Sequence, residues 1–159
     1  VPSTPVISFC SFSTIDKNSA IITFNFSYPD GDIGLHQEDT SGLYSKNGVG
    51  YYDFYMRYYC LGKVSGKYTT YYHQFGTTPN PLVDSVIFAY RIPFVTNNIK
   101  SKTLDGQIIV NLNGYKPGNP APGTPPDSLN YFKYEFWIYD RALHKSNVVT
   151  TPNFYVYYP

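Results

Sequence analysis

The sequence has little charge and no long apolar run. Only 14% of its 159 residues are Asp, Glu, Lys or Arg, the formal net charge is +1, and like charges never run beyond a pair. Binding to nucleic acid requires a basic surface that neutralises phosphates, so we expect no nucleic-acid partner. No apolar stretch approaches the roughly 20 residues with which a helix spans a bilayer.

Cysteine is scarce as well. Cys10 and Cys60 are the only two, and the CxxC spacing of redox or zinc chemistry is absent, which excludes catalysis by cysteine. Both fall in strand-like segments, and two interpretations stay open. They form a cross-sheet disulfide, or they are two buried thiols that pack as small hydrophobes.

Residues that favour helices are sparse, whereas aromatic residues are abundant. Aromatic side chains make up 19% of the chain, with 18 Tyr and 11 Phe, and 13 Pro and 12 Gly punctuate its length. Aromatic residues favour strands, and frequent Pro and Gly are typical of short strands joined by turns. We therefore expect an all-β protein.

Alternation of apolar and polar residues locates the strands. It predicts strands over 5–14, 19–28, 51–60, 66–75, 85–95, 104–113, 130–140 and 147–158. This number favours an antiparallel, immunoglobulin-like β-sandwich of about eight strands, as a single domain over 1–159. We expect residues 1–5 to be a linker, 29–50 and 114–129 to be long loops, and a bulge near Cys10, where the first strand changes face.

The same alternation assigns inward and outward residues. In 51–60 it places Asp53 and Arg57 outward, and in 130–140 it places Lys133 and Glu135 outward. The inward residues include Ala20, Ile22, Phe24, Phe26, Tyr28, Tyr52, Phe54, Met56, Tyr58, Phe88, Tyr90, Ile92, Leu112, Phe132, Tyr134, Phe136 and Ile138.

Polar residues cluster where two strands end. Asp30 and Asp32 follow the strand 19–28, while Asp140, Arg141 and Asn147 follow the strand 130–140. In an immunoglobulin-like topology these loops and the loop 96–101 emerge at the same end of the sandwich. We therefore expect these five side chains to form a polar patch there.

Two interpretations of this patch stay open. Calcium takes six to eight oxygen ligands, which Asp30, Asp32, Asp140 and Asn147 would supply with Glu38 or Asp39. Alternatively, the carboxylates accept hydrogen bonds from loop N–H groups and Arg141 pairs with one of them, so that the patch clamps the loops. The second interpretation is favoured, because the match to an EF-hand is poor.

Other chemistries find less support. His36 and His144 lie near the same end, but their spacing specifies no zinc site, and we expect exposed loop histidines. His73 is expected on a strand surface. No Ser–His–Asp set or nucleophile elbow is readable, and two carboxylates on one turn are poorly placed to flank a glycosidic bond. We therefore expect no enzyme, and a hydrolase site in the end loops is the least favoured alternative.

Aromatic side chains also alternate outward on the strands 51–60, 130–140 and 147–158. They include Tyr51, Tyr55, Tyr59, Tyr131, Trp137, Tyr139, Tyr155 and Tyr157. Such rings bind sugar faces or protein partners when exposed. The alternative is that the loop 29–50 or 114–129 covers them as a second small core.

Two motifs carry a family resemblance. Asp30-Gly31-Asp32-Ile33-Gly34 follows the second strand, and Asp140-Arg141-Ala142-Leu143-His144-Lys145-Ser146-Asn147 lies near the end of the chain. With the strand start 104–108, they resemble uncharacterised β-sandwich lipoprotein domains exported by Bacteroidetes. The resemblance implies export and an acylated cysteine upstream of Val1, and no established activity. Because the sequence begins with Val1 rather than Met, we expect a fragment whose targeting segment has been removed.

These observations lead to a functional hypothesis. We expect a non-catalytic, exported β-sandwich with a structural or binding role at the cell envelope, in the periplasm or at the outer-membrane surface. The alternative is a carbohydrate-binding module that uses the outward Tyr and Trp side chains. A glycan or an envelope protein is the expected partner, calcium is the one cofactor considered, and membrane contact would come only through the lipid anchor.

Overall fold

The structure is a computed structural model that describes residues 4–16, 19–29, 32–62, 67–70, 87–96, 103–113 and 131–155. At Asp32, residues 60–62, residues 67–70, Thr96, Tyr131 and Tyr155, only the backbone is described. The elements are β1 (Val6–Thr14), β2 (Ser19–Tyr28), β3 (Asp32–Ile33), the 3-10 helix η1 (Gly42–Tyr44), β4 (Phe54–Gly62), β5 (Lys67–Thr70), β6 (Ile87–Tyr90), β7 (Val95–Thr96), β8 (Leu104–Asn113), β9 (Tyr131–Ile138), β10 (Val149–Thr150) and β11 (Phe154–Tyr155).

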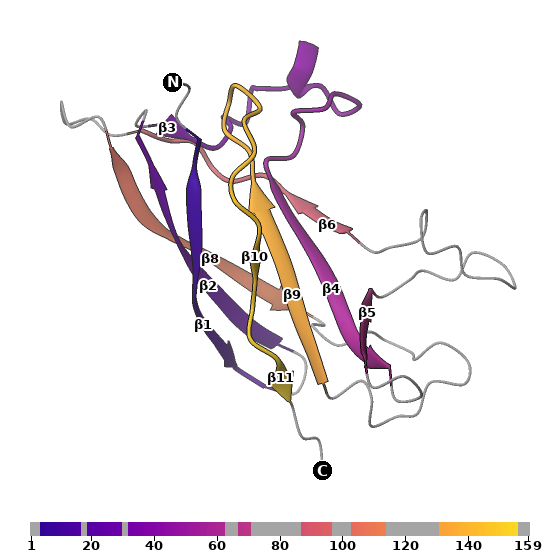
Figure 1. The fold of residues 1–159 in the computed structure, drawn as a ribbon. Coiled ribbons are helices and arrows are strands. Elements are labelled where there is room, and N and C mark those ends of the chain that lie inside the picture. Colours follow the sequence, from indigo (N-terminus) through magenta and orange to yellow (C-terminus); the bar gives the residue numbers. More distant parts are fainter. Residues whose placement is uncertain are drawn as a thin grey trace, which may run out of the picture.

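Two antiparallel sheets lie face to face (Figure 1), which confirms the predicted all-β sandwich. One sheet has the order β1-β2-β8. The other has the order β10-β9-β4-β5, with β11 also paired to β9 and β6 paired to β4. A short third pairing, β3 with β7, lies at one end of the sandwich. Strands β4, β9, β10 and β11 thus share one sheet, while the immunoglobulin-like identity stays a prediction.

The core forms from the alternating faces that the sequence indicated. Strand β2 buries every second residue from Ala20 to Tyr28, and β9 buries Phe132, Tyr134, Phe136 and Ile138. Rings stack across the two sheets, with Phe24 4.7 Å from Phe136 and 5.4 Å from Phe54 between centroids. Burying each such ring stabilises the fold by roughly 1.5–3 kcal/mol, so this aromatic layer dominates the packing between the sheets.

Three inward assignments are wrong. Tyr52, Phe88 and Tyr90 are 39%, 39% and 43% exposed. Tyr52 precedes β4, so the strand alternation does not extend to it. Phe88 and Tyr90 lie on β6, which pairs with β4 and not with β8. Such an edge strand has a neighbour on only one side among the described residues, which leaves its rings partly open to solvent.

The expected bulge in the first strand is confirmed. The register of β1 against β2 shifts between Phe9 and Ser11, so that Cys10 has no partner residue across the pair. The Cys10 side chain is exposed and free, which argues against the cross-sheet disulfide. The Cys60 side chain, the loop 114–129 and His73 lie outside what the structure describes.

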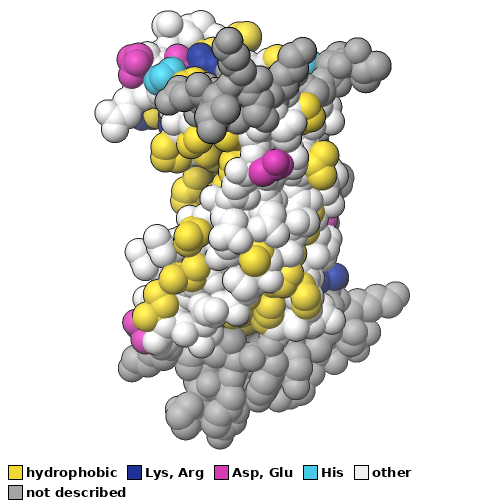
Figure 2. Space-filling model, turned by 90° about the vertical axis from the view of Figure 1, so that its left-hand side faces the viewer, with side chains coloured by type: hydrophobic (Ala, Val, Ile, Leu, Met, Phe, Trp, Pro, Cys, Tyr) yellow, Lys and Arg dark blue, Asp and Glu magenta, His cyan; other side chains and the backbone are white. Residues whose placement is uncertain are grey.

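The two sheets present different outer surfaces. The outer face of the β1-β2-β8 sheet carries mainly short uncharged polar side chains, among them Thr23, Asn25, Gln107 and Asn111. Little charge is visible on that flank of the molecule in Figure 2. Aromatic and charged side chains are instead concentrated on the outer face of β4 and β9 and in the loops at one end.

Candidate functional site

The loops at one end of the sandwich are joined by backbone pairing. Ile33 of β3 pairs with Val95 of β7, and Leu35 donates to the Ile92 carbonyl oxygen (2.8 Å) and accepts from the Phe94 N–H (3.1 Å). Gly34 makes this approach possible, because its φ is +88° and any Cβ there would overlap the Pro93 carbonyl oxygen. The part of the loop that follows Asp32 is therefore held against the segment 91–96.

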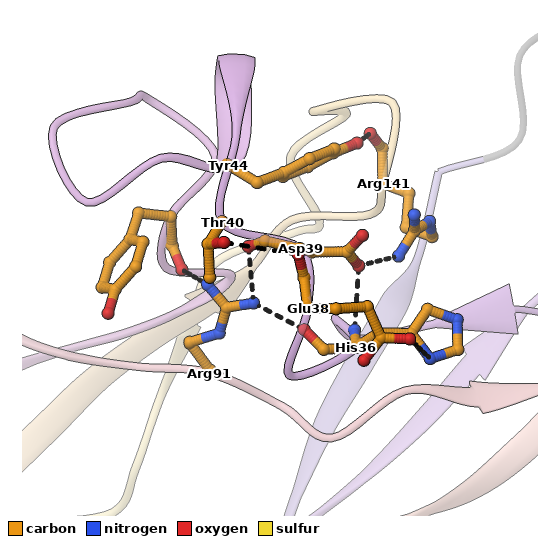
Figure 3. A network of polar contacts seen from close by, with 8 residues as sticks. His36, Glu38, Asp39, Thr40, Tyr44, Arg91 and Arg141 are labelled. Carbon is orange, nitrogen blue, oxygen red and sulfur yellow. Dashed lines mark hydrogen bonds and ion pairs between the residues drawn. The ribbon is translucent and has the colours of Figure 1, made fainter.

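Arg91 holds this loop by binding backbone carbonyls. Its guanidinium donates to the carbonyl oxygen of Tyr51 (3.1 Å) and to those of His36 (2.8 Å) and Asp39 (3.0 Å), the last two labelled in Figure 3. It also lies 4.9 Å from the centroid of the Tyr51 ring. Buried carbonyl groups need donors, and one arginine satisfies three of them here. Tyr51 thus belongs to the loop end rather than to an aromatic sheet surface.

Arg141 adds a second contact between the loops. Its Nη1 lies 2.6 Å from Asp39 Oδ2, which also accepts the His36 N–H at 2.9 Å (Figure 3). The hydrogen bond from Arg141 holds the pKa of Asp39 below its usual value, and the His36 N–H acts in the same direction. Tyr44 donates its hydroxyl to the Arg141 carbonyl oxygen. Two of the three loops expected at this end, 29–50 and 140–147, therefore meet through Asp39 and Arg141, while 97–101 lies outside the described residues.

Asp140 is buried and holds its own loop. Its Oδ1 accepts the His144 N–H at 2.8 Å, and its Oδ2 accepts the Tyr28 hydroxyl at 3.0 Å and lies 2.8 Å from His144 Nδ1. The carboxylate, 2% exposed as a residue, therefore ties the turn 140–144 to the end of β2. Both of its oxygens are engaged by protein groups.

Asn147 lies further along the same loop and binds strand β1 rather than the loop 29–50. It makes two hydrogen bonds to the backbone of Ile7. Asp30 and the side chain of Asp32 lie outside the described residues, so the predicted pairing of Arg141 with either, and the calcium shell, stay predictions. Within the ranges that the structure describes, no three His, Cys, Asp or Glu side chains cluster as metal ligands would.

The two histidines of this end have separate roles. The His36 ring lies 3.8 Å from the Phe94 ring between centroids, and its Nδ1 is 3.9 Å from Glu38. His144 is oriented by Asp140 as described above. These separate partners give no support to a shared zinc site.

The outer face of β4 and β9 carries a second cluster. We call it the outer ladder, and it consists of Tyr55, Arg57, Tyr59, Lys133, Glu135, Trp137 and Tyr139. The strand register places Tyr55 opposite Trp137, Arg57 opposite Glu135 and Tyr59 opposite Lys133. The Tyr55 and Trp137 rings stack at 5.7 Å with an interplanar angle of 4°, and Tyr139 meets Tyr55 edge-on at 5.6 Å.

Charged side chains are interleaved with these rings. Arg57 pairs with Glu135 at 2.9 Å, and the Tyr59 hydroxyl donates to the other oxygen of Glu135 at 3.2 Å. Lys133 lies 5.6 Å from the Tyr59 ring centroid. The tyrosines are half-buried, so their rings remain partly accessible from outside.

The Trp137 side chain is covered, so it is not part of an exposed aromatic surface. It is 7% exposed, with the Lys145 amine 4.5 Å and the Arg57 guanidinium 5.5 Å from its ring centroid. Among the described contacts its cover consists of two cations and the Tyr55 ring. Trp137 Nε1 and Arg57 Nε are both buried without a hydrogen-bond acceptor. The Tyr155 side chain lies outside the description.

Two functional residues were missed from the sequence. Asp53 is expected to point outward, yet it is 3% exposed; its Oδ1 accepts the Ile92 N–H at 2.7 Å and its Oδ2 has no partner. Burial raises the pKa of Asp53 to about 7. Arg91 was not singled out either, although a lone charge within the apolar run 85–95 signals a buried, bonded role.

Comparison with family models, curated proteins and solved structures finds no match to this chain. Across the described residues, no helix has the length and apolar character that crossing a membrane requires. The arguments for function therefore depend on the geometry of the two clusters.

Proposed function

We propose that this protein is a non-catalytic, exported β-sandwich domain that binds a carbohydrate on its outer ladder. The observation that carries the proposal is a pair of buried donors, Trp137 Nε1 and Arg57 Nε, that have no hydrogen-bond acceptor. Both lie next to half-buried tyrosine rings. Buried donors without partners cost free energy. The oxygens of a sugar can accept hydrogen bonds from these donors, and the apolar face of the sugar can pack on the tyrosine rings.

The geometry of the rings suits this ligand. Tyr55 and Tyr59 lie four residues apart on β4, about 13 Å along the strand, and Tyr139, just past the end of β9, lies edge-on to Tyr55. A rigid sheet holds the rings in one surface without further ordering cost. Trp137 lies beneath the exposed side chain of Lys145, which moves aside more easily than a packed loop.

The loop end supports a non-catalytic role. Arg91, Arg141 and Asp140 are each engaged by two or more groups of the protein. Ser146 accepts the Ile138 N–H and donates to the Asn147 carbonyl oxygen, so its hydroxyl is also committed. We assign this end to scaffolding. Export to the periplasm or outer-membrane surface follows from the resemblance of the two loop motifs to exported lipoprotein domains.

The test is binding to an array of neutral and acidic glycans, with Tyr55→Ala and Tyr139→Ala as variants. Both variants should lose the binding that the unmodified protein shows. Tyr52→Ala is the matched control, because Tyr52 is exposed but lies outside the outer ladder, and it should bind normally. The proposal is overturned if the folded protein binds no glycan on the array, or if both ladder variants bind as well as the unmodified protein.

A further inference from the structure

We infer that the carbohydrate bound by the outer ladder is acidic and carries uronate carboxylates. This inference rests on the proposed function and names the ligand class. Two cations, Arg57 and Lys145, lie over the Trp137 ring, against one surface carboxylate among the described residues of this face, Glu135. The whole chain has a formal net charge of only +1, so this face holds a local excess of positive charge.

The single carboxylate of the ladder is already neutralised. Glu135 accepts from Arg57 on one oxygen and from the Tyr59 hydroxyl on the other. The nearby Asp53 lies beneath the surface, and burial favours its neutral form. Lys145 is therefore the cation of this face whose charge no described carboxylate neutralises.

Lys145 is the group that an anion would recruit. Its side chain is exposed, and its amine lies over the Trp137 ring with no carboxylate partner among the described residues. A cation–π contact at an exposed site is weaker than a charge-assisted hydrogen bond. A uronate carboxylate would thus draw the ammonium from the ring, and the uncovered Trp137 would gain the sugar as its new neighbour.

The orphan donors complete the site. Arg57 uses Nη1 for Glu135, while its Nε has no acceptor, and Trp137 Nε1 beside it also has none. Uronate oxygens provide acceptors for these N–H groups and counter-charges for the cations at once. A neutral sugar provides only the first.

The test uses Trp137, the only tryptophan of the chain, as the reporter. The full chain is titrated with an oligogalacturonate and with its fully methyl-esterified form, which has the same sugar backbone without charge. We expect the acid to change the emission and the quenching of Trp137 and to bind roughly tenfold or more tightly than the ester. The affinity for the acid should fall as ionic strength rises.

Variants separate the ladder from general charge. Lys145→Ala should remove most of the preference for acid over ester, and Lys145→Arg should retain it. Lys46→Ala is the matched control, because it removes an exposed lysine of the loop 29–50, and it should leave the preference unchanged. Circular dichroism confirms that each variant is folded.

Each contrary outcome has its own meaning. Equal binding of acid and ester overturns the acidic ligand and leaves carbohydrate binding intact. No binding of either form, together with a silent glycan array, overturns both proposals. If polyglutamate binds as tightly as the oligogalacturonate, the ladder recognises negative charge and not the sugar, which also overturns the inference.

Discussion

The side chain of Asn147 makes both hydrogen bonds to the backbone of Ile7 that a neighbouring strand would make. Its Nδ2 donates to the Ile7 carbonyl oxygen and its Oδ1 accepts the Ile7 N–H, each at 2.8 Å. The two residues are 140 positions apart in the chain: Ile7 lies in β1, and Asn147 lies in the loop that leads to β10 of the other sheet. Because the Ile7 side chain is buried in the core, this contact closes one edge of the sandwich directly beside the core.

Asn147→Ala should lower the free energy of unfolding by roughly 1–2 kcal/mol, since it leaves two backbone groups with water as their only partner. Asn147→Asp is the informative companion, because it keeps the acceptor and loses the donor. Its free energy of unfolding should lie between those of the wild type and the alanine variant. Urea unfolding measures all three. Equal stability of the three proteins would show that this contact does not hold the edge.

The pair of Arg141 with Asp39 predicts acid sensitivity at the loop end. The pKa of Asp39 is lowered in the fold from its ordinary 3.8 by the hydrogen bond from Arg141. Its stabilisation is therefore present above pH 3.8 and is lost as pH falls through the lowered value. In Asp39→Asn this part of the pH dependence should disappear, as measured by thermal melts across acidic pH.

A double-mutant cycle then assigns the effect to the pair. Arg141→Ala and Asp39→Asn should each lower the melting temperature. The decrease in the double variant should be smaller than the sum of the two single decreases. Strict additivity would mean that the two side chains act independently, despite their 2.6 Å contact.

Two glycines test the approach of the loop 29–50 to the segment 91–96. Gly34 and Gly42 both have positive φ, at +88° and +57°, but only a Cβ at Gly34 would overlap the Pro93 backbone, whereas nothing lies within 4 Å at Gly42. Gly42→Ala should cost about 1 kcal/mol for its conformation alone, and Gly34→Ala should cost roughly 1–3 kcal/mol or more. Chemical denaturation measures the difference, and a smaller loss at position 34 than at 42 would contradict the steric argument.

The sequence predicted the core well because alternation reports burial directly. Every predicted inward residue of β2, from Ala20 to Tyr28, is buried, and the reversal of face at Cys10 appears as a bulge. The pattern failed at Asp53, which precedes the first strand residue, Phe54. A strand's alternation carries no information about a residue that the preceding turn directs inward.

The candidate sites were predicted less completely. That the end loops meet followed from topology, yet the choice of Asp39 depends on how the loop 29–50 folds back, which turn residues alone do not specify. On the outer ladder the aromatic positions were predicted, whereas the cover over Trp137 was not. Lys145 reaches that ring from the loop after β9, and periodicity within strands says nothing about side chains that arrive from loops.

Asp53 predicts that the protein becomes less stable as pH rises toward neutrality. Its carboxyl group is buried, one oxygen has no partner, and burial raises its pKa from 3.8 to about 7. Between these values the folded state binds more protons than the unfolded state, so the free energy of unfolding falls as pH rises. At about 1.4 kcal/mol per unit, the loss across this interval is on the order of 4 kcal/mol.

Asp53→Asn separates this effect from other titrations. The amide oxygen can still accept the Ile92 N–H, now 2.7 Å from Oδ1, but the side chain no longer ionises. We expect the variant to lack the decline between pH 4 and 7 and to be at least as stable as the wild type at higher pH, because a buried charge costs more than a buried neutral amide. Urea unfolding of both proteins at several pH values measures the difference. Parallel pH profiles would show that Asp53 ionises in the fold as readily as in water, and that the buried, unpartnered oxygen has found a donor in solution.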